Sequence, residues 1–296
     1  MMWFKDTGRG IAESTEFLKR GAMVHGADAA ADLVTYGCIK GYLGWRVLSC
    51  LYHVIWIILT GVYSWQFAGP DPNQQVKWFI YLTDWTYFIL TVATLLDCAV
   101  VAYVFIARKD IAEGKIATMT WYLKADWVMF EMSNAANLLI TVLFWSLIYK
   151  GGYPTNAVII ETHALNSVYV ILNLLFTGVP VRIYHVFYSM LYALVYVFFS
   201  AFYYIGGGKN YNDQPYIYSV LDWGGSPAWA AFYSLMALLI GLPVCHMICY
   251  ATYVVRQSIH SKCLVSKSST RSEPERELEN IHVSAVAPYS YNSMTP

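Results

Sequence analysis

The chain has 296 residues, of which 57% are hydrophobic and only 13% carry a charged side chain. A soluble globular domain carries roughly 25% charged residues, so this composition excludes an ordinary soluble protein. Basic and acidic residues balance at 19 each, so no net field favours nucleic acid, and we expect no nucleic-acid partner.

Six apolar segments are long enough to cross a bilayer, which takes roughly 20 residues of helix. Because lipid offers no partner to free backbone N–H and C=O groups, each segment must be helical. The sequence therefore predicts an all-α fold: a polytopic transmembrane helical bundle of about six spanning helices. In chain order the predicted spans are Leu43–Trp65, Phe79–Ala107, Trp127–Tyr149, Ala157–Thr177, Val181–Ile205 and Ala228–Val255.

The chain divides into three parts around these spans. Residues 1–42 form a polar N-terminal segment, residues 43–255 form the transmembrane domain, and residues 256–296 form a Ser-rich tail that we expect to be disordered. The fourth and fifth spans are joined by a short connection that ends at Pro180, which predicts an antiparallel helical hairpin. Pro243 interrupts the sixth span, and we expect a kink there.

Basic residues fall mainly on one side of the predicted membrane. They occur before or at the start of the first span, in the second and fourth connections and in the tail, whereas the opposite side has Lys77, Lys150 and Lys209. The positive-inside rule then predicts that both chain ends are cytoplasmic. The basic residues assigned to the cytoplasmic side are Lys5, Arg9, Lys19, Arg20, Lys40, Arg46, Arg108, Lys109, Lys115, Lys124, Arg182, Arg256, Lys262, Lys267, Arg271 and Arg276.

Polar side chains within the spans are costly to bury, so each is a candidate functional group. Polar residues recur at helical spacing on two of the spans, so each set lies on one face of its helix. These two polar stripes are Glu131, Asn134 and Asn137 on the third span, and His163, Asn166 and Asn173 on the fourth. A stripe that faced lipid would leave amides and carboxyls without partners, so both stripes are expected to face the bundle interior. These side chains either hydrogen-bond between helices or bind a ligand. The candidate binding residues are His53, Asp84, Asp97, Glu131, Asn134, Glu161 and Asn166.

Two histidine arrangements suggest further chemistry. His53 and Asp97 both lie near the middle of the membrane. They form either a packed, hydrogen-bonded pair or a site for a proton or a ligand. His185 and His246 share a depth toward the cytoplasmic side, as ligands of a haem electron carrier would. The six cysteines show no metal-ligand spacing, so we expect no metal site and no cofactor.

Thr83 and His163 are the candidate catalytic residues. Helical rise puts both about 5–10 Å below the outer membrane surface, on the second and fourth spans, where the ester bond of a lipid could reach them. A hydroxyl needs a nearby base to become a nucleophile, and histidine is the usual base near neutral pH. Threonine is also common in membrane helices, so simple packing is the alternative.

Four segments of the chain resemble the rolling stone family of animal membrane proteins. They read YLTDWT at 81–86, HALNSVY at 163–169, VPVRIYH at 179–185 and YSVLDW at 218–223, and the resemblance runs from about Leu43 to Val255. Rolling stone proteins are associated with the plasma membrane and with myoblast fusion. The resemblance therefore implies a multi-pass plasma-membrane protein with a role in myoblast or cell fusion and no assigned reaction.

A more distant similarity reaches the androgen-induced, multi-spanning hydrolases of fatty acid esters of hydroxy fatty acids. These enzymes use an intramembrane threonine nucleophile and a histidine, and the segment before Thr83 is similar to theirs. Their histidine region reads His-Gly-Met-His, with the second histidine catalytic, whereas this chain has Asn166 at the last position. His163 lies one turn earlier and can act only if the helix is rotated or shifted.

Two functions from different classes remain open. A non-enzymatic protein acting in adhesion or fusion through its loops and tails would make Thr83 dispensable and the loop at 206–227 important. An intramembrane hydrolase of lipid esters would use Thr83 as nucleophile with His163, or Asn166 as an orienting group. Membrane lipids are the expected partners and a lipid ester is the candidate substrate, and the sequence identifies no protein partner.

Overall fold

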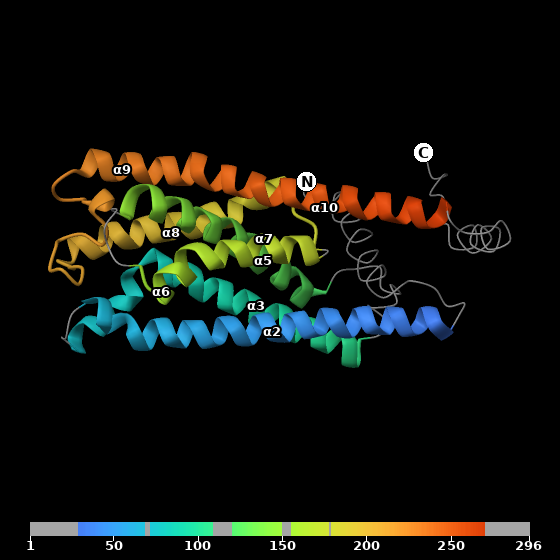
Figure 1. Cartoon of the computed structure of the whole chain (residues 1–296). Helices are drawn as coiled ribbons and strands as arrows, with labels where there is room; N and C mark the ends of the chain where they lie inside the picture. The colour runs from blue at the N-terminus through green and yellow to red at the C-terminus, as the bar shows by residue number, and fades with distance from the viewer. Residues whose placement is uncertain (1–28, 69–71, 109–119, 150–154, 178, 270–296) are drawn as a thin grey trace, which may run out of the picture. The chain divides into compact units, whose positions relative to one another are not determined.

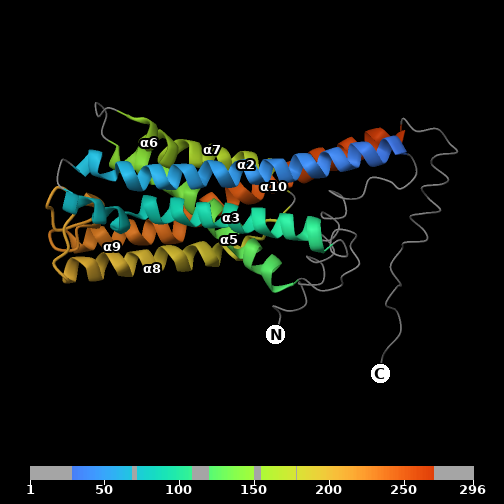
Figure 2. The ribbon, with the colours of Figure 1, turned by 90° about the horizontal axis from the view of Figure 1, so that it is seen from below.

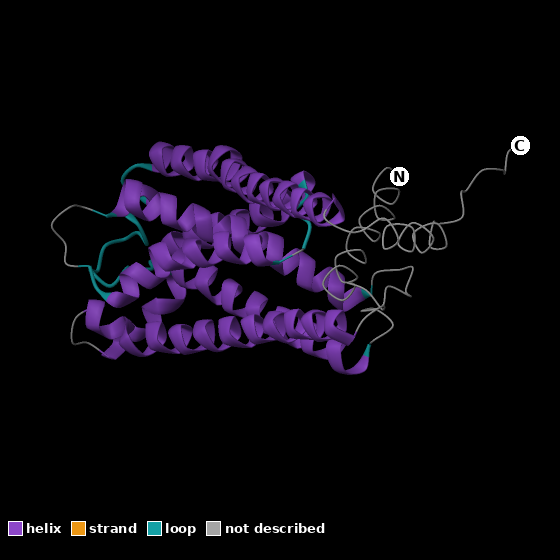
Figure 3. Cartoon of the chain, turned by 45° about the vertical axis from the view of Figure 1, so that its right-hand side comes forward, coloured by secondary structure: helices purple, strands orange, loops and turns teal. Residues whose placement is uncertain are grey.

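The computed structural model describes residues 29–68, 72–108, 120–149, 155–177 and 179–269. Within these ranges the chain is helical or in loops, without a strand (Figure 3). The described residues fall into two units divided after Tyr253, and the bundle discussed below belongs to the first. The main helices are α2 (Ala29–Ala68), α3 (Leu82–Ala107), α5 (Trp121–Leu143), α6 (Ala157–Ile160), α7 (Asn166–Phe176), α8 (Val186–Ile205), α9 (Pro227–Met236) and α10 (Leu242–Ser269).

Tighter and wider helical turns connect or extend these helices. The tighter ones are the 3-10 helices η2 (Pro72–Ile80), η5 (Ile183–His185) and η6 (Ser219–Leu221). The wider ones are the π-helical turns η3 (Phe144–Ile148), η4 (Glu161–Leu165) and η7 (Ala237–Gly241).

Six of the described helical segments are long and apolar enough to cross a membrane, which confirms the predicted fold class. Their exposed surfaces support this: on α8, Phe187 is 64% exposed and Phe202 is 69% exposed. Such surfaces are favourable only in lipid, so the chain is an integral membrane protein. The spans are Gly41–Tyr63, Leu82–Ala107, Trp121–Ile148, Ala157–Phe176, Ile183–Ile205 and Pro227–Ile259.

The helices differ from the predicted spans mainly at their ends. α2 begins at Ala29 and α10 continues to Ser269, because a helix does not have to stop where its apolar run stops. Conversely, Phe79 belongs to η2, and Tyr81 has an extended backbone before α3 begins. Tyr196 holds this break: its hydroxyl donates to the Ile80 carbonyl (2.8 Å) and accepts from the Leu82 N–H (3.1 Å). The N-terminal residues 1–28 and the tail from 270 lie outside the described ranges.

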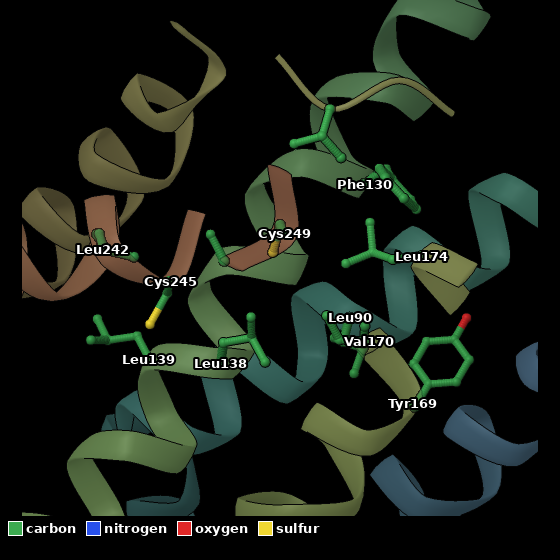
Figure 4. Close-up of a cluster of buried hydrophobic side chains, with 12 residues drawn as sticks. Leu90, Phe130, Leu138, Leu139, Tyr169, Val170, Leu174, Leu242, Cys245 and Cys249 are labelled. Atoms are coloured by element: carbon green, nitrogen blue, oxygen red, sulfur yellow. The ribbon is translucent and has the colours of Figure 1, made fainter. Parts of the chain in front are cut away.

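α5 lies at the centre of the bundle. Of its span, 56% is buried, against 17% for the span that contains α8. Figures 1 and 2 show α5 between α3 and α8, with α2 along the far side of α3. Its apolar face packs into a core with α3, α7 and α10, in which Leu139, Val170 and Cys245 are buried (Figure 4). The cysteine at 245 therefore packs as a small apolar side chain.

The site described below lies at one end of the bundle, which we call the loop end. There the first turn of α3, the end of α8 and the start of α9 meet beneath the loop at 206–226 (Figure 1). Trp223 anchors this loop by donating to the Ser200 hydroxyl of α8 (3.1 Å). Gly207 lets the chain leave α8, with a φ of 77° that side chains other than glycine rarely adopt.

Candidate functional site

Thr83 and His163 meet at the loop end of the bundle. Thr83 lies in the first turn of α3, His163 lies in η4, and 3.2 Å separates Thr83 Oγ1 from His163 Nε2. His163 is only 8% exposed. The two residues predicted to share a depth are thus within hydrogen-bonding distance of each other.

The hydrogen bonds of the imidazole determine its role. Nδ1 lies 3.0 Å from the Ile159 carbonyl, which can only accept, so Nδ1 carries the proton. The Thr162 hydroxyl, also 3.0 Å from Nδ1, donates to Val158 and can therefore accept from the same N–H. In the neutral ring Nε2 then has a free lone pair, so it can accept a hydrogen bond from the Thr83 hydroxyl.

Aromatic side chains of the third span hold His163 in place. The Phe144 ring stacks on the imidazole, with centroids 3.6 Å apart and planes 23° from parallel. The indole N–H of Trp145 donates to the His163 carbonyl (2.8 Å). The ring is therefore fixed from its face and from its backbone, so it need not be ordered when a substrate arrives.

A cavity of about 490 Å³ adjoins Thr83 and His163. Its deeper wall is apolar and comes from α5, α8 and the start of the sixth span, including Leu143, Ala193 and Leu238. Lys77 and Asn210 line it near the loop. This size is typical of small-molecule sites, which combine an apolar lining with a few polar groups.

All three π-helical turns contribute to this cavity. Phe144 and Leu147 come from η3, His163 from η4, and Leu238 from η7. A π-turn adds a residue to one turn, which widens the helix and shifts the faces beyond it, and such turns occur often at functional sites. In η4 this is the local change of register by which His163 reaches Thr83. Pro243 follows η7 and cannot donate to a carbonyl one turn earlier, so the irregularity expected there takes the form of a π-turn.

Tyrosines of the loop end surround Thr83 from the other side. Tyr81, Tyr211 and Tyr218 line the cavity, and the Tyr81 ring packs edge-on against Tyr218 at 5.6 Å. Tyr218 interacts with both the side chain and the backbone N–H of Thr83. Burial raises the pKa of all three phenols, and the neighbouring carboxyl of Asp84 raises each pKa further. The three hydroxyls therefore remain protonated near neutral pH.

Asp84 lines the same cavity, one residue after Thr83. Its position in the first turn of α3 is favourable for a carboxylate, because the N-terminal end of a helix carries partial positive charge. Among the predicted binding residues it is the one that lines the cavity with Thr83 and His163. The others lie elsewhere in the bundle, and all of them except Asn134 have hydrogen-bond or ion-pair partners there.

The two polar stripes meet each other inside the bundle. The Asn166 amide donates to the Asn137 carbonyl oxygen (3.1 Å), and Thr141 donates to the Asn166 oxygen (3.2 Å). Asn166 is therefore occupied between α5 and α7 and does not contact Thr83. Asn134 is buried, and its amide nitrogen has no hydrogen-bond partner among the described residues.

Glu161 lies two residues before His163 in η4 and is fully buried. Its carboxylate accepts from the Tyr87 hydroxyl of α3 (2.8 Å) and from the Tyr52 hydroxyl of α2. These bonds tie the π-turn to two neighbouring helices. Glu161 thus supports the segment that carries His163 and is not itself a lining residue of the cavity.

Asp97 pairs with Arg46, so the predicted pairing of His53 with Asp97 is wrong. Arg46 is one of the basic residues expected to flank the first span, yet only 1% of it is exposed. Its guanidinium also donates to Asn173 (2.8 Å) and Thr177 (2.7 Å), and these contacts draw it inside. The Nδ1 atom of His53 instead lies 2.8 Å from the backbone carbonyl one turn earlier.

Glu131 joins three segments at the opposite end of the bundle. One carboxylate oxygen accepts from the Arg182 backbone N–H (2.8 Å) and lies 3.1 Å from His185 Nδ1. The other oxygen lies 3.9 Å from His246 Nε2, which donates to the Arg182 carbonyl (2.8 Å). Both histidines therefore bind protein groups. Among the residues that the structure describes, no group of three or more His, Cys, Asp or Glu side chains could hold a metal ion.

Two features of the site, Tyr218 and the π-turns, are absent from the residues predicted from the sequence. Tyr218 lies far from Thr83 along the chain and reaches it only because the loop folds back over α3. The π-turns depend on local packing against neighbours. For Tyr218 a weak signal existed, since it opens one of the segments that resemble the rolling stone family.

These features define a polytopic helical membrane protein with a hydroxyl–imidazole pair beside an apolar cavity. The family model described as "Protein rolling stone" matches residues 42–269, so the chain belongs to the rolling stone family. Protein rolling stone of Drosophila melanogaster is 30% identical over 191 residues, which cover 60% of this chain and 67% of that protein. No solved structure matches the chain.

Proposed function

We propose that this protein is an intramembrane hydrolase of lipid esters, with Thr83 as nucleophile and His163 as general base. The observation that carries the proposal is the 3.2 Å contact between Thr83 Oγ1 and the unprotonated Nε2 of His163, beside an apolar-lined cavity. A buried hydroxyl next to an oriented imidazole is the arrangement that activates an alcohol for attack on a carbonyl.

The reaction would proceed in two stages. Thr83 Oγ1 bonds to the ester carbonyl carbon while its proton passes to His163 Nε2, and the same proton then leaves with the alcohol as the C–O bond breaks. Water next attacks the acyl-threonine, His163 accepts the proton of this water, and the threonine oxygen regains it as the acid departs. The Ile159 carbonyl, which binds Nδ1–H, stabilises the imidazolium formed in each stage.

The cavity supports a substrate with an acyl chain. Apolar side chains such as Leu143, Val197 and Leu238 would contact the chain, and the ester would lie beside Thr83. Asp84 and Lys77, near the loop, would contact the polar part of the molecule. The resemblance to the androgen-induced hydrolases suggests fatty acid esters of hydroxy fatty acids as the substrate class.

Covalent labelling tests the proposal directly. Full-length protein purified in detergent is treated with a fluorophosphonate probe, and the labelled peptide is identified by mass spectrometry. Labelling should occur at Thr83 and be absent in Thr83→Ala and His163→Ala. Thr252→Ala is the matched control, because that hydroxyl bonds only back to its own helix at Ile248 and should not affect labelling. Labelling that persists in Thr83→Ala would refute the nucleophile.

The cellular setting is a separate proposal. Family membership supports a plasma-membrane protein with a role in cell fusion, including myoblast fusion, and the basic residues favour cytoplasmic chain ends. The loop at 206–226 would then face the outside. Epitope tags at either terminus should stain only permeabilised cells. If cells expressing Thr83→Ala fuse as well as the wild type, the fusion role is independent of hydrolysis.

A further inference from the structure

Attack on an ester creates a negative charge that His163 does not stabilise. As Thr83 Oγ1 bonds to the carbonyl carbon, an electron pair moves onto the carbonyl oxygen. A hydrogen-bond donor placed where that charge develops is usually the largest single contribution to catalysis of acyl transfer. The donor must lie beside Thr83 but cannot be the imidazole, which receives the proton.

Tyr218 meets this requirement. Its hydroxyl interacts with the side chain and the backbone N–H of Thr83, and the residue lines the cavity together with Thr83 and His163. The adjacent Ile217 is 4% exposed, and the Tyr218 carbonyl accepts from the Leu221 N–H (2.9 Å) at the start of η6. The phenol is therefore positioned by a folded part of the loop.

Three other hydroxyl or indole donors lie near Thr83, and two of them are already bound to protein groups. Tyr196 donates to the Ile80 carbonyl, and Trp145 donates to the His163 carbonyl. The third, the buried Tyr81 hydroxyl, has no hydrogen-bond partner within the described part of the chain, but it is Tyr218 that interacts with Thr83 itself. Burial keeps the pKa of Tyr218 above its usual value, so its proton is retained. The hydroxyl partners of Tyr218 are Thr83 and Tyr196, and both are neutral, so its proton can turn from them to an oxyanion, which is the stronger acceptor.

We infer that Tyr218 is a further catalytic residue of this site: its hydroxyl donates a hydrogen bond to the carbonyl oxygen of the ester when Thr83 attacks. The inference rests on the proposed hydrolase function. The Tyr218 proton is not transferred in this step: the Thr83 proton moves to His163, and Tyr218 stabilises the oxyanion. When the alkoxy C–O bond breaks, the electron pair returns to the carbonyl and this hydrogen bond weakens.

Kinetics of Tyr218→Phe test the inference. The full-length protein in detergent micelles is assayed with p-nitrophenyl octanoate, whose leaving group departs without protonation, so the rate of acylation reports stabilisation of the oxyanion. Loss of the donor should lower kcat about 100-fold while KM changes little, because the interaction exists only in the transition state. Tyr203→Phe is the matched control: it removes a hydroxyl that bonds to Lys209 in the same loop (2.9 Å) and should leave kcat near the wild-type value.

The possible results separate the two proposals. If Tyr218→Phe keeps the wild-type kcat while Thr83→Ala is inactive, the role of Tyr218 is refuted and the hydrolase function stands. If the wild type shows no Thr83-dependent hydrolysis, both are refuted. If Tyr218→Phe does not fold, 3-fluorotyrosine at position 218 replaces it. This analogue keeps the ring and makes the hydroxyl a stronger hydrogen-bond donor, so kcat at neutral pH should rise above the wild-type value, and an unchanged kcat would refute the inference.

Discussion

The buried ion pair between Arg46 and Asp97 is the most sensitive point of the bundle. Arg46 is 1% exposed and Asp97 is 6% exposed, so neither charge can reach water or lipid headgroups. Asn173 and Thr177 satisfy two further donor positions of the guanidinium. We predict that Asp97→Asn leaves a buried cation without its counter-ion and strongly destabilises the protein.

The size of the effect follows from the burial. Breaking a buried pair by removing one partner costs about 3–5 kcal/mol, whereas replacing both partners with apolar residues is often neutral. For a chain of this size, the single change should lower Tm by about 6–20 °C. The double variant Arg46→Met/Asp97→Leu should recover most of this loss, because it removes the unpaired charge as well as the pair.

Thermal unfolding in dodecyl maltoside micelles, followed by tryptophan fluorescence, measures these differences. Asp213→Asn is the control, since the carboxylate of Asp213 is 76% exposed and lies 3.9 Å from Lys77 at the protein surface. Exposed pairs contribute little, so its Tm should not change measurably. A Tm for Asp97→Asn as high as that of Asp213→Asn would refute the reasoning that Arg46 depends on this carboxylate.

Three further changes test the surroundings of the site. Asn166→Ala removes the partner of Asn137 and should lower the free energy of unfolding by about 1–2 kcal/mol in an SDS titration; an unchanged midpoint would contradict this. Tyr87→Phe leaves Glu161 with one hydroxyl donor fewer and should lower the free energy of unfolding by about 1–3 kcal/mol in the same titration; a wild-type midpoint would show that Glu161 does not depend on this donor. Ala193→Phe should reduce the cavity and slow labelling by a long-chain fluorophosphonate about tenfold, equivalent to about 1.4 kcal/mol, while a methyl fluorophosphonate reacts at its normal rate. Equal slowing of both probes would show that the cavity does not hold the chain.

The membrane-spanning helices follow from the amino-acid sequence alone. Lipid cannot bind free backbone groups, so long apolar runs such as Leu82–Ala107 and Ile183–Ile205 must be helical. Distance along a helix is also proportional to residue number, at about 1.5 Å per residue. The common depth of Thr83 and His163 is therefore predictable from their positions within the apolar runs.

Rotation about a helix axis and the choice of neighbour, in contrast, depend on the tertiary structure. Asp97 bonds to Arg46 and not to His53, because packing turns the guanidinium inward between α2, α3 and α7. Likewise, the widened turn η4 brings His163 to Thr83 while Asn166 faces α5. The depth of a residue in the membrane depends on its position along the chain alone. The direction in which its side chain points depends on the simultaneous packing of many side chains from several helices, which cannot be calculated from one segment at a time.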